Sequence, residues 1–233
     1  MNEFPYNYQQ SAMPIAQRVS QVMKRVYVKM FLALLVTAAC SFSASTTGFV
    51  MYMAQHSWVY WGLFIAMIGI VFGLSAGIQR MKSSTATAVF YLFAVLMGLS
   101  LSTIFIVYSG ASLFKTFLIT AGVFGAMSVY GYTTGRDLSR FGSFMVMALF
   151  GLIIVSLINI FMRSTQLEWI ISFVGVIIFI GLTAWDTQQV KRMAEQMPES
   201  TYGHLATIGA LNLYLDFINL FLYLLRFFGS SRD

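Results

Sequence analysis

Seven long apolar segments limit what this chain can fold into. They comprise residues 30–53, 58–78, 86–108, 113–133, 142–162, 167–188 and 205–228. Each has about 20 residues, enough to cross a hydrocarbon core of about 30 Å, and charged side chains are rare within them. Lipid offers the backbone no hydrogen-bond partners, and the segments lack the alternating polarity of barrel strands. The sequence therefore predicts an all-α integral membrane protein with seven transmembrane helices.

Composition and loop lengths indicate one membrane domain. The chain is 58% hydrophobic and 9% charged, whereas soluble domains carry about 25% charged residues. We expect a flexible cytoplasmic tail over residues 1–28 and a seven-helix transmembrane domain over 29–233. The loops are too short to hold a soluble domain. The longest, residues 189–204, is predicted to extend the sixth helix and then turn.

The basic residues are distributed unevenly between the two sides of the predicted bundle. The amino-terminal tail and alternate loops hold ten Lys and Arg residues, and the opposite side holds four. Because basic residues concentrate on the cytoplasmic side, we expect a cytoplasmic amino terminus and an external carboxyl terminus. The net charge of +6 follows from this asymmetry and a scarcity of acids, and it indicates no nucleic-acid partner.

Two acidic residues lie within the apolar segments. Asp186 is near the end of the sixth, and Asp216 is well inside the seventh. A charged group at the centre of a span costs about 2.5–3.5 kcal/mol on insertion scales, so such residues usually have a functional role. Of the other six acids, Glu168 lies at the very start of the sixth segment and five fall in tails or loops, and all six are expected to be solvated.

The seventh segment carries a polar face. Asn212, Asp216, Asn219 and Tyr223 fall within about 60° of arc on a helix, and Thr183 precedes Asp186 by about one turn. A polar face is costly against lipid, so we expect it to face the bundle interior or a wet cavity. The alternative is a hydrogen-bonded network that only fastens helices together. The sequence alone leaves open whether the two carboxyl groups meet.

If Asp186 and Asp216 do meet, the two carboxylates cannot both ionise easily at close range, so the pair would share a proton and act as a pH sensor. Arg80, at the end of the second segment, is expected on the same side of the membrane as Asp186. It could act as a latch on the pair, or equally as a positive-inside anchor.

The second segment contains two overlapping small-residue motifs. Gly69, Gly73 and Gly77 are spaced four residues apart and form a smooth stripe on one helix face. Such a stripe predicts close helix packing. The alternative is a face along which the helix slides or tilts.

Three motifs carry a family resemblance: GLTAWDTQQVK over residues 181–191, LYLDFINLFLYLLRFFG over 213–229, and GRDLS over 135–139. With seven spans, the chain resembles the bacterial branch of the Bax inhibitor-1 family. This resemblance implies six helices around a central seventh and a proton-sensitive calcium leak, in which Asp186 pairs with Asp216 and Arg80 contacts the pair. IQRMK is a poorer match to the arginine cluster of relatives, and GIVFGLSAG lacks the acid that some of them carry there.

We therefore predict a pH-sensitive calcium leak channel in the bacterial cytoplasmic membrane, with no resident cofactor. Calcium prefers six to eight oxygens, so Asp186 and Asp216, helped by Asn212, Asn219, Thr183 and water, would bind it only weakly and transiently. The alternative is a non-conducting regulatory protein that binds a membrane quality-control protease or a stress-response partner.

An enzymatic function is not expected. Two aspartates on successive spans are typical of intramembrane aspartyl proteases, which use a shared proton for hydrolysis. Those enzymes resemble one another in a Gly-x-Gly-Asp at the second acid, whereas Asp216 follows Tyr-Leu here. The seventh segment also lacks the lysine that retinal needs for a Schiff base.

Overall fold

The computed structural model describes residues 14–230, with the side chain of Gln79 excepted, and its regular elements are helices. Seven of its helical segments are long and apolar enough to cross a membrane, which confirms the predicted class. In order the elements are α1 (Ile15–Thr46), α2 (Phe49–Gln55), α3 (Ser57–Gly77), η1 (Ile78–Arg80), α4 (Ser83–Leu101), α5 (Ile104–Val107), α6 (Gly110–Thr133), α7 (Ser139–Met162), α8 (Thr165–Gln196), η2 (Glu199–Thr201) and α9 (Tyr202–Phe228).

The first helix differs from its prediction at both ends. α1 begins at Ile15, so residues 15–28 are helical where a flexible tail was expected. Residues 1–13 of that tail lie outside the described range. The single helix predicted over 30–53 is interrupted after Thr46, because Gly48 adopts a left-handed φ of 77° and the chain restarts as α2. Glycine tolerates this conformation at little cost.

The third span is also interrupted, whereas the sixth follows its prediction. The segment predicted over 86–108 forms α4 and then the short α5, separated by a turn at Ser102 and Thr103. In contrast, α8 extends to Gln196 and is followed by Pro198, which confirms the predicted helix extension and turn. A proline cannot continue a helix that needs its N–H group.

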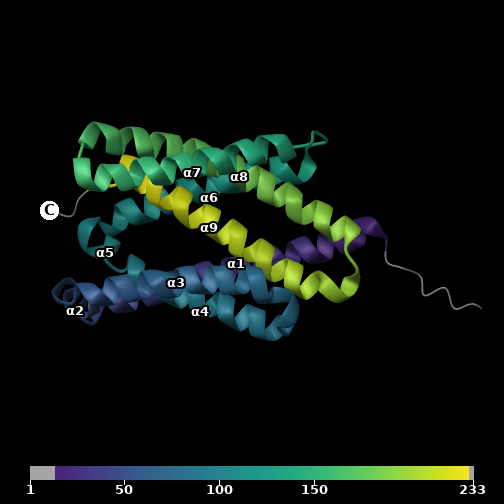
Figure 1. Ribbon diagram of the computed structural model, residues 1–233, viewed down its shortest axis with the longest axis horizontal. Coiled ribbons are helices and arrows are strands. Elements are labelled where there is room, and N and C mark those ends of the chain that lie inside the picture. The colour runs from purple at the N-terminus through teal and green to yellow at the C-terminus, as the bar shows by residue number, and fades with distance from the viewer. Residues whose placement is uncertain (1–13, 231–233) are drawn as a thin grey trace, which may run out of the picture.

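α9 is the most enclosed of the spans. In Figure 1 it runs between α6, α7 and α8 on one side and α1, α3 and α4 on the other. It packs against α1, α4, α6 and α8, while α3 packs mainly on α4 and α7 on α8. In its most apolar 18-residue window, 67% of the residues are buried, compared with 6% for α3. An arrangement in which all six other spans surround α9 stays a prediction.

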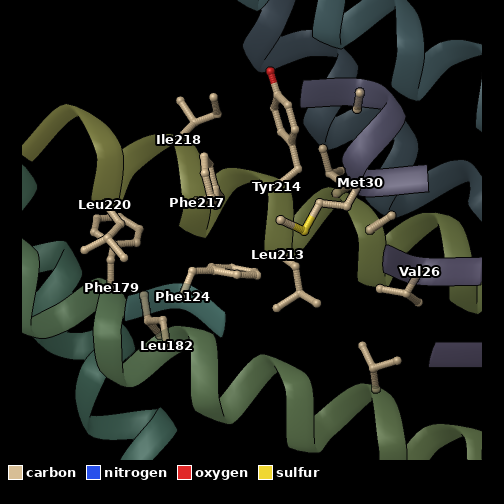
Figure 2. Close-up of a cluster of buried hydrophobic side chains, with 14 of the residues drawn as sticks. Val26, Met30, Phe124, Phe179, Leu182, Leu213, Tyr214, Phe217, Ile218 and Leu220 are labelled. Atoms are coloured by element: carbon tan, nitrogen blue, oxygen red, sulfur yellow. The ribbon is translucent and has the colours of Figure 1, made fainter. Parts of the chain in front are cut away.

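The core is built around α9. Figure 2 shows apolar side chains from this helix meeting others from α1, α6 and α8. The labelled residues are Leu213, Tyr214, Phe217, Ile218 and Leu220 of α9, Val26 and Met30 of α1, Phe124 of α6, and Phe179 and Leu182 of α8. Burial on this scale fixes the rotation of α9 and therefore the direction of its polar residues.

The glycine stripe of α3 does not pack against another helix within the described residues 14–230. Gly69 and Gly73 are exposed, and a Cβ atom added at either would meet no atom within 4 Å. At Gly77 it would meet only the end of the Met81 side chain, at 3.1 Å. The packing predicted for these glycines was therefore wrong within the chain. The spacing of small residues indicates a smooth face but not which surface covers it.

Candidate functional site

Two glycines hold the part of α8 that precedes Asp186. Gly131 of α6 lies directly against the backbone of Ala184, and Gly142 of α7 lies against the indole ring of Trp185. A Cβ atom at either position would collide with these groups. The close approach of three helices fixes the position and rotation of α8 immediately before the first acidic residue.

Gln188 fastens α8 to the loop that contains the GRDLS motif. Its Oε1 accepts a hydrogen bond from the N–H of Leu138 at 2.8 Å, and its Nε2 donates to the carbonyl of Arg136 at 2.8 Å. The side chain is buried, with 5% of its surface exposed. Two of the three motifs in the sequence are therefore physically joined, half a turn beyond Asp186.

On α9, the residues that flank Asp216 fix its direction. The hydroxyl groups of Tyr214 and Thr37 of α1 lie 2.6 Å apart. Phe217 makes edge-to-face contacts with Phe117 and Phe124 of α6, at centroid distances of 5.5 and 5.4 Å. With these neighbours anchored to α1 and α6, Asp216 points toward α8.

The structure brings Asp186 and Asp216 together. Their carboxyl groups are hydrogen-bonded to each other, and the residues are only 8% and 4% exposed. A hydrogen bond between two carboxyl groups requires at least one proton, because a carboxylate is only an acceptor. Neither group forms an ion pair with a described Lys or Arg. Oδ2 of Asp216 is buried and has no hydrogen-bond partner among the described residues.

A second contact supports the same antiparallel register of α8 and α9. Phe179, seven residues before Asp186, stacks on Tyr223, seven residues after Asp216, at a centroid distance of 5.9 Å. Seven residues are about two helical turns, so both contacts lie along one seam. Tyr223 also lies against Gly175 and beneath the guanidinium of Arg226, 5.6 Å from its ring centroid. Tyr223 therefore packs along this seam and does not join the carboxyl pair.

Two other residues of the predicted polar stripe bond within their own helices. Nδ2 of Asn219 donates to the carbonyl of Leu215 at 2.8 Å, and the hydroxyl of Thr183 donates to the carbonyl of Phe179 at 2.7 Å. Asn212 is half-buried on α9. In this conformation the expected polar network is reduced to the two carboxyl groups, and no wider cluster of metal-binding residues occurs within residues 14–230.

The structure does not bring Arg80 to the pair. Its side chain is exposed at the end of η1, and it forms no ion pair with a described acid. The predicted latch is therefore absent from this conformation, and a role for Arg80 in another conformation stays a prediction.

Lys29, which the sequence does not single out as a site residue, joins three helices. Its ammonium group donates to the hydroxyl groups of Thr207 at 2.6 Å and Thr87 at 2.8 Å, and lies 3.5 Å from the carbonyl of Gly203. α1, α4 and α9 therefore meet at one cation. In the sequence, Lys29 is indistinguishable from a basic residue that flanks a span.

The fold and site define a multi-pass α-helical membrane protein whose last two spans share a buried carboxyl pair. The chain belongs to the Bax inhibitor-1 family: residues 19–233 match the family model described as "Inhibitor of apoptosis-promoting Bax1".

Bacterial relatives match along nearly the whole chain. The inner membrane protein YbhL of Escherichia coli K12 is 48% identical over 214 residues, which cover 90% of this chain and 92% of the relative. A protein of Borreliella burgdorferi is 41% identical over 217 residues, covering 92% and 94%. The protein RP147 of Rickettsia prowazekii is 42% identical over 212 residues, covering 91% and 90%.

Proposed function

We propose that this protein is a pH-sensitive calcium leak channel of the bacterial inner membrane, controlled by the Asp186–Asp216 pair. The observation that carries the proposal is the hydrogen bond between two buried carboxyl groups on neighbouring spans. In the hydrocarbon region, such groups typically mark ion or proton pathways.

The proton state of the pair supplies the gating principle. While one proton is shared, the pair holds α8 and α9 together at Asp186 and Asp216. Loss of that proton leaves two negative charges in contact where water cannot screen them, and the repulsion favours separation of the helices. Calcium would compete with the proton for the same oxygens, which couples ion passage to pH.

The small number of ligands suits conduction. Two carboxyl groups fall short of the six to eight oxygens that calcium prefers, so neutral oxygens and water would complete the shell. Asn212 and Asn219 lie about one helical turn from Asp216, and Thr183 lies about one turn from Asp186. Their oxygens would contribute to the calcium shell after the helices rearrange. A site of this kind binds weakly and releases readily, as conduction requires.

The proposed membrane location is supported by the name of one relative, and the proposed orientation by the distribution of basic residues. The Escherichia coli relative is named an inner membrane protein. The excess of basic residues on the side of the amino terminus supports a cytoplasmic amino terminus and an external carboxyl terminus.

Calcium flux into proteoliposomes tests the proposal. The wild type should show flux that changes with pH, whereas Asp186→Asn and Asp216→Asn should each lose that pH dependence, because the aspartate that remains can ionise without facing a second negative charge. Asparagine has nearly the same shape as aspartate, so the packing of α8 on α9 should be retained.

Unchanged pH-dependent flux in both variants would refute the role of the pair. If the pure wild-type protein conducts at no pH, the leak itself is refuted. A membrane protease or stress-response protein that copurifies would then favour the non-conducting regulatory alternative.

A further inference from the structure

A cavity of about 370 Å³ lies between α1, the end of α4, α5, α6 and α9, and neither Asp186 nor Asp216 lines it. Its walls include Leu34, Ile104, Leu113, Ile218 and Phe221. Thr37 and Ser41 are the two lining residues with hydroxyl groups, and the others present apolar side chains or glycine. The volume falls within the range of about 300–1,000 Å³ that is typical of small-ligand sites.

The mouth of this cavity is continuous with the membrane-facing surface. Phe114 and Phe117 of α6 line it and are 66% and 41% exposed, and Ala38 of α1 lines it and is also exposed. These residues lie on two spans, so the medium in front of them is hydrocarbon. The deeper wall is different, because Phe217, Ile218 and Phe221 of α9 are only 4%, 5% and 8% exposed.

Ser41 borders the cavity without making its surface polar. The residue is 2% exposed, and its hydroxyl has no hydrogen-bond partner among the described residues. A serine within a helix commonly bonds back to a carbonyl of the preceding turn, which Ser41 does not do. The neighbouring hydroxyl of Thr37 is already engaged with Ala94 and Tyr214. The atoms around it enclose this hydroxyl, so the surface that an occupant of the cavity meets is almost entirely apolar.

Water is a poor occupant of this cavity. A buried water molecule needs two to four polar partners, and apolar cavities of this kind remain dry. An empty cavity forfeits the dispersion contacts of its whole lining. An apolar chain restores those contacts.

We propose that the cavity binds one acyl chain of a membrane phospholipid. The chain enters between α1 and α6 at Ala38 and lies against Phe217 and Phe221.

Photolabelling tests this site without relying on channel activity. The full chain is placed in phosphatidylcholine vesicles that include a phosphatidylcholine with a diazirine in its acyl chain, irradiated, and digested for mass spectrometry. We expect adducts on the buried wall at Phe217, Ile218 or Phe221, in addition to those on exposed Phe114. Adducts on Phe114 without any on the buried wall would overturn the proposal.

Two substitutions on α1 form a matched pair for the same experiment. Ala38→Trp places an indole at the mouth and should reduce labelling of the buried wall several-fold. Ala39→Trp puts the same side chain on the adjacent exposed position, which does not line this cavity, and should leave that labelling unchanged. Equal labelling in the two variants would overturn the entry route, and gel filtration checks that both are folded.

Discussion

The hydroxyl group of Thr37 has two neighbours, and their geometry identifies the donor in each bond. It donates to the carbonyl of Ala94 at 2.9 Å, so its single proton is used. In the 2.6 Å contact with Tyr214, the tyrosine must therefore be the donor. The bond joins α1, α4 and α9 close to Asp216.

This direction predicts unequal effects for two substitutions. Tyr214→Phe removes a donor and leaves Thr37 bonded to Ala94, at a cost of about 0.6 kcal/mol, the average for such bonds in membranes. Thr37→Val leaves the fully buried hydroxyl of Tyr214 without a partner, at a cost of about 1–3 kcal/mol. Unfolding in detergent should show Thr37→Val as the less stable variant. The reverse order would contradict the assigned donor.

Asp137 provides a test of which aspartate senses pH. This exposed residue lies outside the spans, in the loop held by Gln188. The N–H of Ser139 first, then its hydroxyl and Arg192, lower the pKa of Asp137 from 3.8 to about 2. Because the pKa is lowered on folding, these contacts stabilise the loop above about pH 4 and lose their effect as the pH falls toward 2.

Asp137→Asn should therefore leave the midpoint of pH-dependent calcium flux where it is in the wild type. The residue stays ionised throughout the neutral and mildly acidic range, so it contributes no proton exchange there. The flux assay on this variant beside Asp186→Asn gives the comparison. A midpoint that moves with Asp137→Asn would assign pH sensing to the loop.

The two buried acids were easier to identify from the sequence than the polar residues that join the helices. Asp186 and Asp216 were identifiable because a carboxyl group inside an apolar span is costly wherever its partner lies. Lys29 and Gln188 were not, because their importance depends on oxygens and N–H groups that other helices supply. Long-range partners of this kind leave no pattern in the local sequence.

At the level of the helices, close packing depends on a few glycines, and spacing alone does not identify them. Gly131 and Gly142 lie against α8, although neither belongs to a run of overlapping GxxxG motifs like that of α3. The repeated Gly69 and Gly73 face away from the bundle. Hydropathy likewise located the spans but not the breaks at Gly48 and Ser102, since it does not weigh backbone conformation.

Gly131→Ala should destabilise the bundle by about 1–3 kcal/mol, because the added methyl collides with a carbonyl group that cannot move independently of α8. Gly125→Ala is the matched control on the same helix. A Cβ atom there meets nothing within 4 Å, so stability should be nearly unchanged. Thermal unfolding of both proteins in detergent gives the measurement. Equal stability of the two variants would show that α6 and α8 are not in this contact.

For the molecule as a whole, the side of the predicted bundle that holds the amino terminus carries ten Lys and Arg residues and the opposite side four, so we expect the amino terminus in the cytoplasm. α1 begins at one end of the bundle and α9 finishes at the other, as Figure 1 shows, which places the carboxyl terminus outside in this prediction. Alkaline phosphatase fused to the carboxyl terminus should therefore be active in bacterial cells, and green fluorescent protein fused there should remain dark. A fluorescent fusion with inactive phosphatase would reverse the predicted topology.

The contact between successive helices α8 and α9 also bears on how the chain is made. During synthesis, α8 leaves the ribosome first and carries Asp186 with no partner for it. A solitary carboxyl group is costly in lipid, so we expect α8 to wait beside the translocon until α9 arrives. The two helices would then enter the bilayer as a hairpin, because the hydrogen bond between the two carboxyl groups lowers the free-energy cost of placing each of them in lipid.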